Sequence, residues 1–406
     1  MAQVVLPKPL VLLPSMVMRL SLIVLLHQIR DALLVSPHGV FVQSAECTYD
    51  DILPKKYVTY KTNALSPDTL DGHLDKEVWN EVPWTDDFVD IATTTNPQFR
   101  TRAKVRWDDQ FLYVGALLED PNVWATLTDH DSIIFHDNDF EIFVDPNATT
   151  HFYKEFEINA LNTTWELVLN KAYGDGGYEN STRVFGTAGW TPEPPLRASV
   201  QVQPDNSLND PLTPSHSWTL EVALPIEKMM ENNTNLAAAG KVWRINFSRV
   251  QWGVAVVDGQ YEKTESCQSC AVPGTAAEDN WVWSSQGEVS MHQPDRWGLL
   301  FFSDDPPSLT PVSEAYAEWP SRSAAMALYY AQKAYKMEHG HFATDLADLL
   351  PFSASPYEVC ASAVTTIEVT TDPVTESQSF VASVASPATP SIVAIIQDDR
   401  KLTVAR

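Results

Sequence analysis

The stretch Ala103–Leu118 reads AKVRWDDQFLYVGALL and indicates the fold class. Ala103–Trp107 alternates apolar and polar residues, as a half-buried strand does, and Phe111–Leu118 is apolar enough for a buried strand. Asp108 and Asp109, which lie between these runs, are typical turn residues. The pattern therefore predicts two strands joined by a short turn.

Similar short runs recur through residues 60–306, separated by Gly, Pro, Asn and Asp. They lie at Phe140–Val144, Phe152–Ala160, Thr164–Leu169, Val200–Gln203, Trp218–Leu224, Val242–Val250 and Leu299–Phe302. Only Ile226–Glu231 has the pattern of a helical turn. Short strands with regularly placed turn residues predict an all-β, antiparallel β-sandwich.

A second, smaller domain is predicted at residues 318–406, after the turn residues Asp304–Pro307. One helix is expected at Ser321–Met337, because apolar residues recur there at helical spacing. Ser321 is expected to cap its start and Gly340 to follow its end. Three strand-like runs close the chain near Thr366, Phe380 and Ile392. We therefore predict a small α+β extension.

The composition is strongly acidic. The chain has 27 Lys and Arg against 53 Asp and Glu, a formal net charge of −26, and 13 Trp. Such a charge repels nucleic acid and anionic membrane surfaces, so we expect neither as a partner. Neutral sugars and cations are not repelled. Tryptophan offers a flat apolar face to a ligand, although most Trp side chains pack in a core.

Residues 1–46 are predicted to be a leader with the features of a signal peptide. The apolar run Leu20–Leu26 follows Arg19, and Val42–Ala45 has the small residues of a cleavage site. His27–Asp31 interrupts the apolar segment, which is too short to span a bilayer, so we do not expect an integral membrane protein. A leader without defined structure is the alternative interpretation.

Sequons and cysteines favour a secreted protein. Asn-x-Ser/Thr sequons occur at Asn147, Asn162, Asn180, Asn232 and Asn246, which together predict a secreted glycoprotein. Two of the four cysteines form the pair Cys267-Gln-Ser-Cys270. A disulfide in a loop is favoured over zinc or redox chemistry, because no second such pair occurs. The disulfide pairing stays open.

The segment between Trp107 and Tyr153 has many acids and no Lys or Arg. The acids are Asp108, Asp109, Glu119, Asp120, Asp129, Asp131, Asp137, Asp139, Glu141 and Asp145. Carboxylates packed without basic partners repel one another unless a cation lies between them, and oxygen ligands on turns suit Ca²⁺. We therefore predict a structural calcium site with Glu119, Asp120, Asp137 and Asp139 as ligands. A solvated acidic surface is the alternative.

Strand alternation places several of these acids together. Asp139, Glu141 and Asp145 share one strand face with Phe143, opposite Phe140, Ile142 and Val144. Residues two apart on such a face lie about 7 Å apart, a distance that an inverting glycosidase pair could use. A glycoside hydrolase with Asp139 and Glu141 is therefore an alternative hypothesis.

Several segments together resemble the family 9 carbohydrate-binding modules, which occur attached to xylanases and in stand-alone secreted proteins. The segments are Leu70–Trp79 (LDGHLDKEVW), Val105–Val114 (VRWDDQFLYV), Asp137–Pro146 (DNDFEIFVDP), Tyr153–Asn159 (YKEFEIN), Trp218–Pro225 (WTLEVALP), Trp243–Arg249 (WRINFSR) and Met291–Gly298 (MHQPDRWG). The resemblance implies a calcium-stabilised β-sandwich that binds a glycan, of the cellulose or xylan type or another polysaccharide, without catalysis. The segment Tyr329–Tyr335 is similar to an extension that follows such modules in some stand-alone members.

Sugar-binding members of the family hold a sugar between two aromatic rings beside polar groups. By motif position, Glu141 and Asn159 match the polar groups, and the ring positions fall on Phe135 and Met291. Met291 departs from the aromatic pattern, and Glu157 stands where an Arg is expected. These departures favour a different ring platform, with candidates Trp124, Trp252, Tyr261, Trp281 and Trp283, or loss of sugar binding.

A haem- or redox-binding sandwich is a further alternative, because related β-sandwiches hold haem through His or Met. The candidate ligands are His130, His136, His151, His292 and Met291. A Soret band would identify this class, sugar-responsive Trp fluorescence would identify a binding module, and turnover that depends on Glu141 would identify an enzyme. The non-catalytic binding module is the favoured function.

Overall fold

The computed structural model describes residues 47, 49–192, 196–264, 278–310, 315–354 and 356–406. The predicted leader and the pair Cys267 and Cys270 lie outside these ranges. Residues 48–406 form one compact unit, which contains the described helices and strands. Cys47 and Cys360 are both disulfide-bonded. Among the described helices, none has the length and apolar character needed to cross a membrane.

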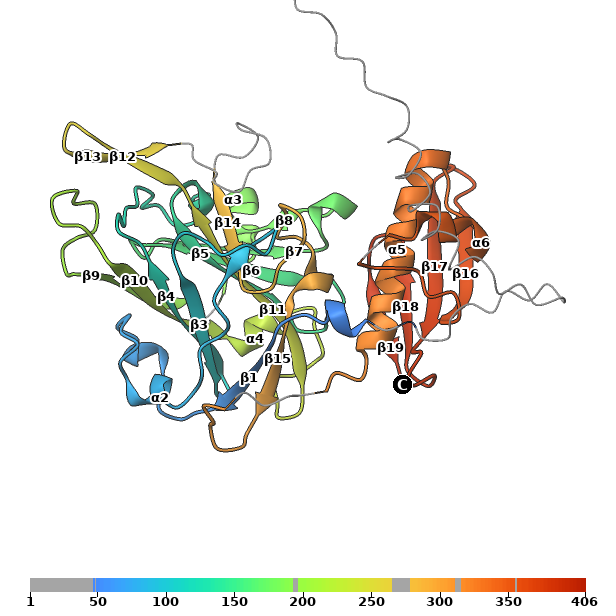
Figure 1. The fold of residues 1–406 in the computed structure, drawn as a ribbon, viewed down its shortest axis with the longest axis horizontal. Helices are drawn as coiled ribbons and strands as arrows, with labels where there is room; N and C mark the ends of the chain where they lie inside the picture. Colours follow the sequence, from blue (N-terminus) through green and yellow to red (C-terminus); the bar gives the residue numbers. More distant parts are fainter. Residues whose placement is uncertain (1–46, 48, 193–195, 265–277, 311–314, 355) are drawn as a thin grey trace, which may run out of the picture. The chain divides into compact units, whose positions relative to one another are not determined.

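A large curled sheet dominates residues 56–303 (Figure 1). Its strands are β1 Lys56–Lys61, β2 Val89–Asp90, β3 Thr101–Trp107, β4 Phe111–Glu119, β5 Asp139–Asp145, β6 Tyr153–Asn159, β7 Thr164–Leu169, β8 Glu179–Asn180, β9 Arg197–Gln203, β10 Ser217–Pro225, β11 Val242–Gln251, β14 Asp279–Val282 and β15 Gly298–Ser303. A separate hairpin joins β12 Gly253–Val257 to β13 Gln260–Thr264. Short helices α2 Glu77–Asn80, α3 Thr182–Phe185 and α4 Ile226–Met229 lie in the connections. The predicted all-β sandwich is confirmed.

The strands follow the order β8-β7-β6-β5-β11-β15-β1-β3-β4-β10-β9, with β14 on β11 and β2 on β14. Neighbours are antiparallel, as predicted, except at β1, which runs parallel to both β15 and β3. Lys56–Lys61 was not predicted as a strand. It lies between β15, the last strand of the sheet, and β3. Parallel neighbours are not joined by a hairpin, so this pairing leaves no local turn signal in the sequence.

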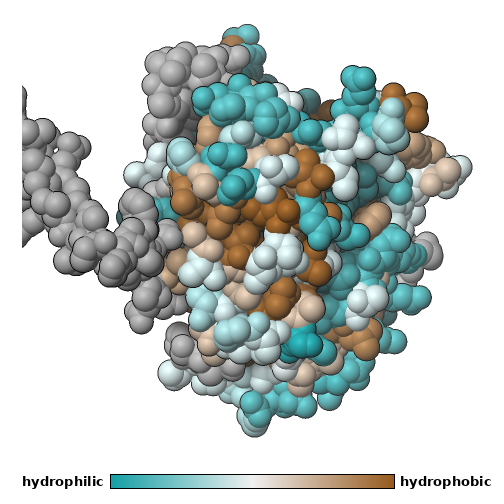
Figure 2. Space-filling model, turned by 90° about the vertical axis from the view of Figure 1, so that its right-hand side faces the viewer, coloured by the Kyte–Doolittle hydropathy of each residue, from teal (hydrophilic) through white to brown (hydrophobic). Residues whose placement is uncertain are grey.

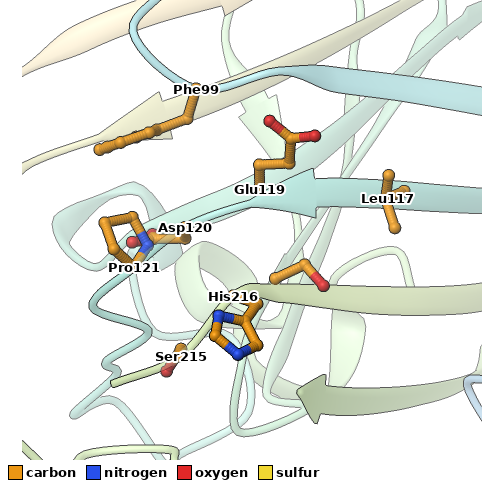
Figure 3. Close-up of a pocket in the computed structure, with 8 residues that line it drawn as sticks. Phe99, Leu117, Glu119, Asp120, Pro121, Ser215 and His216 are labelled. Carbon is orange, nitrogen blue, oxygen red and sulfur yellow. The ribbon is translucent and has the colours of Figure 1, made fainter. Parts of the chain in front are cut away.

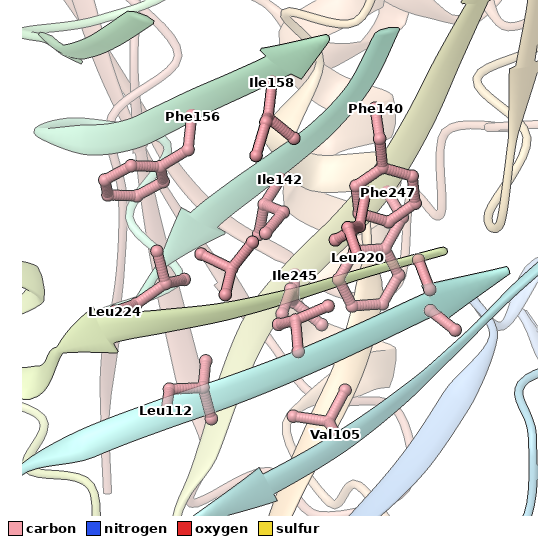
Figure 4. Close-up of a cluster of buried hydrophobic side chains, with 14 of the residues drawn as sticks. Val105, Leu112, Phe140, Ile142, Phe156, Ile158, Leu220, Leu224, Ile245 and Phe247 are labelled. Atoms are coloured by element: carbon pink, nitrogen blue, oxygen red, sulfur yellow. The ribbon is translucent and has the colours of Figure 1, made fainter. Parts of the chain in front are cut away.

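The core lies between the two halves of the curled sheet. Phe140, Ile142 and Val144 of β5 are buried there, as strand alternation predicted. They pack with side chains from the opposite half, including Val105 and Leu220 (Figure 4). Each such side chain contributes roughly 1.5–3 kcal/mol through burial. This packing fixes which face of β5 points away from the core.

The C-terminal region contains the predicted helix, α5 Trp319–His339. Gly340 ends it in the left-handed conformation, at φ 80°, as expected. The expected cap at Ser321 is wrong: Glu318 is the N-cap, and the Ser321 hydroxyl donates to the Glu318 carbonyl inside the first turn. Pro320 explains the earlier start, because proline is favoured in the first helical turn.

Four strands form the C-terminal sheet, where three were predicted. They are β16 Val364–Thr371, β17 Gln378–Ala385, β18 Val393–Gln397 and β19 Leu402–Ala405, and α6 Leu346–Leu349 precedes them. One face packs on α5 through buried side chains such as Phe380 and Ile396. On the other face Val381 is 41% exposed, and Figure 2 shows apolar surface bordered by polar side chains on that side.

Buried ion pairs join this region to turns of the sandwich. The Arg400 guanidinium donates to Asp175 Oδ2 at 2.8 Å and to Asp295 Oδ1 at 3.2 Å. Tyr329 donates to Asp175, and Tyr330 donates to Asp295 at 2.8 Å. Arg400 has a left-handed backbone, with φ 71°, so these bonds hold a conformation that a non-glycine residue rarely adopts.

Candidate functional site

The candidate site lies on the face of β5, β6 and β11 that points away from the core; we call it the site face. Glu141 of β5 lies directly opposite Glu157 of β6 and Ser248 of β11. Opposite residues in antiparallel strands project to the same side. Asp139 and Glu155 lie on this face for the same reason. Strand register thus gathers acids from two strands that are separated in sequence.

Three of these acids form a tight group, which we call the carboxyl cluster: Asp139, Glu141 and Glu157. One carboxylate oxygen from each lies within 4.8 Å of the others. Their exposed fractions are only 0%, 5% and 1%, so the expected alternative of a solvated acidic surface is wrong at these positions. The cluster is therefore a group of buried carboxyl side chains on the sheet.

Burial and mutual repulsion raise the pKa values of the carboxyl cluster. Loss of solvation raises the pKa of Glu141 to about 7. Burial, and then the charge of Glu141, hold the pKa values of Asp139 and Glu157 well above their usual range. The neighbouring Glu155 behaves in the same way. A ligand that neutralises or hydrogen-bonds these groups would therefore be strongly favoured.

Polar atoms on the site face lack hydrogen-bond partners within the described part of the chain. They are Oδ2 of Asp139, Oε2 of Glu141, Oε2 of Glu155, Oγ of Ser248 and the indole Nε1 of Trp165. Trp165 lies opposite Glu157 in the register of β6 and β7. Unsatisfied buried groups cost about 1–3 kcal/mol each. The face thus offers both acceptors and a donor to a ligand that carries hydroxyl groups.

Phe135 borders the carboxyl cluster and is held at both ends of its backbone. Its N–H donates to Glu157 Oε2 at 3.0 Å, and its carbonyl accepts from Trp252 Nε1 at 2.8 Å. The half-buried ring packs against two apolar groups, one with Met291 and Trp165 and one with Trp124 and Trp252. The predicted ring positions Phe135 and Met291 therefore lie in one cluster, beside the acids.

The remaining predicted binding residues have different surroundings. Trp283 is buried in the sandwich core, where a Cβ on Gly298 would lie 2.2 Å from its ring. The amide of Asn159 is fully engaged: it donates to the Leu127 carbonyl and to Asp137, and it accepts from two backbone N–H groups. Trp283 thus lies in the core, and the Asn159 side chain is held in a hydrogen-bond network.

The four predicted calcium ligands do not form one group. Glu119 pairs with Arg100 at 2.6 Å, and Asp120 pairs with Arg249 at 3.2 Å. Figure 3 shows Glu119 and Asp120 lining a shallow pocket together with Phe99 and His216.

Asp137 accepts hydrogen bonds from the backbone and hydroxyl of Thr126 and from the Leu127 N–H. Asp139 belongs to the carboxyl cluster instead. Only Asp139 of the predicted ligands thus lies among carboxylates that could share a cation.

The histidines considered for haem have protein partners. His151 Nε2 lies 3.1 Å from Asp399, and His292 Nδ1 lies 2.9 Å from the Tyr153 hydroxyl. Burial lowers the pKa of His292 to about 4, so this ring is neutral. His136 is exposed, and so is His130, whose Nδ1 lies 3.1 Å from the Thr164 carbonyl.

The sequence interpretation missed Ser248 and Trp165. Each lies in a predicted strand, and alternation alone could have assigned each to one of two faces. Only the pairing of β5 with β11, and of β6 with β7, shows that they face the acids.

Residues 70–188 match the family described as carbohydrate family 9 binding domain-like. The resemblance predicted from the sequence is confirmed over that range, which includes Phe135, the carboxyl cluster and Trp165. Ser248, Trp252 and Met291 lie beyond it. No curated protein sequence matches the chain significantly.

Solved structures give low similarity. A protein from Bacteroides uniformis, assigned provisionally to carbohydrate binding, has 15% identity and a TM-score of 0.41, covering 62% of this chain and 100% of its own. A family 9 module from Caldicellulosiruptor kristjanssonii in complex with cellotriose has 15% identity and a TM-score of 0.38, covering 64% and 100%. The complex with glucose has 15% identity and a TM-score of 0.37, covering 63% and 100%.

Proposed function

We propose that the chain is a non-catalytic carbohydrate-binding protein and that the site face binds a sugar unit of an oligosaccharide or polysaccharide. The observation that supports this most is the set of unpartnered buried polar atoms beside Phe135. Sugar hydroxyls would donate to the oxygens of Asp139 and Glu141 and accept from the Trp165 indole. The C–H groups of the sugar would contact the Phe135 ring. The family match of residues 70–188 supports the same class.

The cellular setting is part of the proposal. The acidic charge, the apolar leader and the sequons support a secreted protein that meets neutral glycans of the cellulose or xylan type. Binding would assist polysaccharide breakdown by holding this protein on the polysaccharide. Structural calcium, expected from the acidic segment, is the further element of this proposal.

Calorimetric titration of the full chain with cello- and xylo-oligosaccharides tests the function, first with calcium and then with EDTA. Glu141→Gln and Phe135→Ala should each weaken binding by tenfold or more, the loss of roughly 1.4 kcal/mol. Phe152→Ala is the matched control, since Phe152 is also a partly exposed aromatic residue, at 38%. An intact fold that gives no heat with any sugar contradicts the proposal. Loss of binding in EDTA alone would support the calcium element.

An enzymatic function has one observation in its favour, since a Glu141 pKa of about 7 would suit a general acid. The spacing is less favourable. The oxygens of Asp139 and Glu141 approach within 4.8 Å, whereas retaining pairs lie about 5–5.5 Å apart and inverting pairs about 6.5–9.5 Å. Release of reducing sugar that Glu141→Gln abolishes would replace binding by catalysis as the function.

A further inference from the structure

A second group of potential ligands lies where the segment 126–132 meets β7. Glu166 of β7 lies opposite Phe156 of β6, so it projects from the side of the sheet opposite to the site face. His130 Nε2 lies 3.3 Å from Glu166 Oε2 and 3.5 Å from Asp131 Oδ1. The His130 ring is 54% exposed, whereas the carboxylates of Asp131 and Glu166 are 7% and 4% exposed. One imidazole thus faces two buried carboxylates from the solvent side.

The hydrogen bonds of His130 determine its tautomer. Its Nδ1 lies 3.1 Å from the Thr164 carbonyl, which also accepts from the Asp131 N–H at 2.9 Å. A carbonyl oxygen can only accept, so Nδ1 must be the donor. In a neutral ring the proton then resides on Nδ1, and Nε2 presents its lone pair to the two carboxylates. That arrangement is repulsive unless a cation lies between them.

The cation could be a proton or a metal ion, and the distances favour the metal. A protonated ring would donate to a carboxylate at about 2.7–2.9 Å. The observed separations of 3.3 and 3.5 Å are longer. Tetrahedral zinc with bonds of about 2.0–2.2 Å to nitrogen and oxygen requires ligand atoms about 3.3–3.6 Å from one another. Both distances from His130 Nε2 satisfy this requirement, and the ligand atoms of the three residues all lie within 4.8 Å of one another.

The second oxygen of each carboxylate is already held by the protein. The Thr164 hydroxyl donates to Glu166 Oε1 at 2.9 Å, and the Thr182 hydroxyl donates to Asp131 Oδ2. Asp131 has a left-handed backbone, with φ 62°, which a non-glycine residue seldom adopts without compensation. These contacts and the His130–carbonyl bond are the outer-shell interactions that orient ligands in metal sites.

We propose that His130, Asp131 and Glu166 form a binding site for a divalent first-row transition metal ion such as zinc. One imidazole with two carboxylates suits such an ion better than it suits calcium, which prefers oxygen ligands alone. The exposed side of the ring leaves the fourth position to water. The ion fastens the segment 126–132 to β7. The same segment carries the Leu127 carbonyl, which Asn159 and Thr163 bind.

Zinc chloride titrated into the full chain, after dialysis against EDTA, tests the site by calorimetry and by metal content. We expect one zinc ion whose binding His130→Gln abolishes. Thr164→Val keeps the carbonyl and removes the hydroxyl contacts to Glu166 and to His130 Nδ1, so it should weaken binding roughly tenfold. His216→Gln, at an exposed histidine, is the matched control and should bind as the wild type does. Cobalt in place of zinc should give the visible absorption of tetrahedral coordination.

Two results would overturn the proposal. Absence of zinc binding by the folded wild-type chain would mean that His130, Asp131 and Glu166 do not form a metal site. Equal binding by the wild type and His130→Gln would place the metal elsewhere. His339 and His341 of the C-terminal region, whose rings lie 6.2 Å apart, are a neighbouring pair of histidines that could bind zinc instead. Loss of zinc binding by His341→Gln would identify that site.

Discussion

Replacing Arg400 by Met tests whether the buried ion pairs stabilise the attachment of the C-terminal region. Methionine keeps most of the aliphatic stem and the left-handed backbone but removes the guanidinium. The Arg400 side chain is 10% exposed, and the carboxylates of Asp175 and Asp295 are each 1% exposed. The substitution therefore leaves two buried carboxylates without their shared cation.

The magnitude follows from what remains. Breaking a buried pair by removing one partner typically costs about 3–5 kcal/mol. Asp175 keeps Lys333 at 3.3 Å, which offsets part of the loss, whereas Asp295 keeps the Tyr330 hydroxyl at 2.8 Å. We therefore expect the free energy of unfolding to fall by about 3 kcal/mol, the lower end of that range.

Urea unfolding at pH 7, followed by Trp fluorescence and circular dichroism, measures this change; coincident curves would justify a two-state fit. Arg406→Met is the control, because Arg406 is 71% exposed and pairs only with Glu318 among the ion pairs described. It should cost less than about 1 kcal/mol. Adding Asp295→Asn to Arg400→Met should recover part of the loss. Equal stability of the two Arg variants would refute the reasoning.

Three further predictions concern the sandwich. Burial raises the pKa of Glu141 from 4.5 to about 7, so the stability that it contributes is complete below pH 4.5 and is lost as pH rises through 7. The free energy of unfolding of Glu141→Gln, measured in urea, should therefore exceed that of the wild type by about 3 kcal/mol at pH 8 and by little at pH 4; a constant difference would contradict this. Gly298→Ala should cost about 1–3 kcal/mol or more, because its Cβ would overlap the Trp283 ring, and a thermal melt unchanged from wild type would disprove the overlap. Mass spectrometry of chain secreted from a eukaryotic host should find glycans at the exposed Asn162 but not at Asn246, which is fully buried and donates to the Ser284 carbonyl; a glycan at Asn246 would be incompatible with this fold.

The local pattern of the sequence was sufficient to predict most of the strands and the helix α5. Alternation in β5 correctly separated Phe140 and Ile142 from Glu141, because side-chain direction in a strand depends only on parity. The helix α5 was recognised because its apolar residues repeat at helical spacing and Gly340 ends it. Both are properties of neighbouring residues.

The composition of the site depended on contacts between distant residues. Asp120 pairs with Arg249, which lies far away in sequence and which no local pattern connects to it. Glu157 and Ser248 join Glu141 only through strand register, which no local pattern specifies. The His130 group was equally hidden, since Glu166 reaches it from another strand.

The parallel pairing of β1 with β15 has a consequence for synthesis of the chain. Lys56 pairs with Leu299, and Tyr60 pairs with Ser303. The pairing of β1 with β15 therefore cannot form until nearly the whole sandwich has left the ribosome. Contacts so distant in sequence slow folding and expose unpaired strand edges meanwhile. Truncation anywhere before Ser303 would thus leave β1 with an open edge, and recombinant production should depend on chaperones or slow expression more than the size of the protein implies.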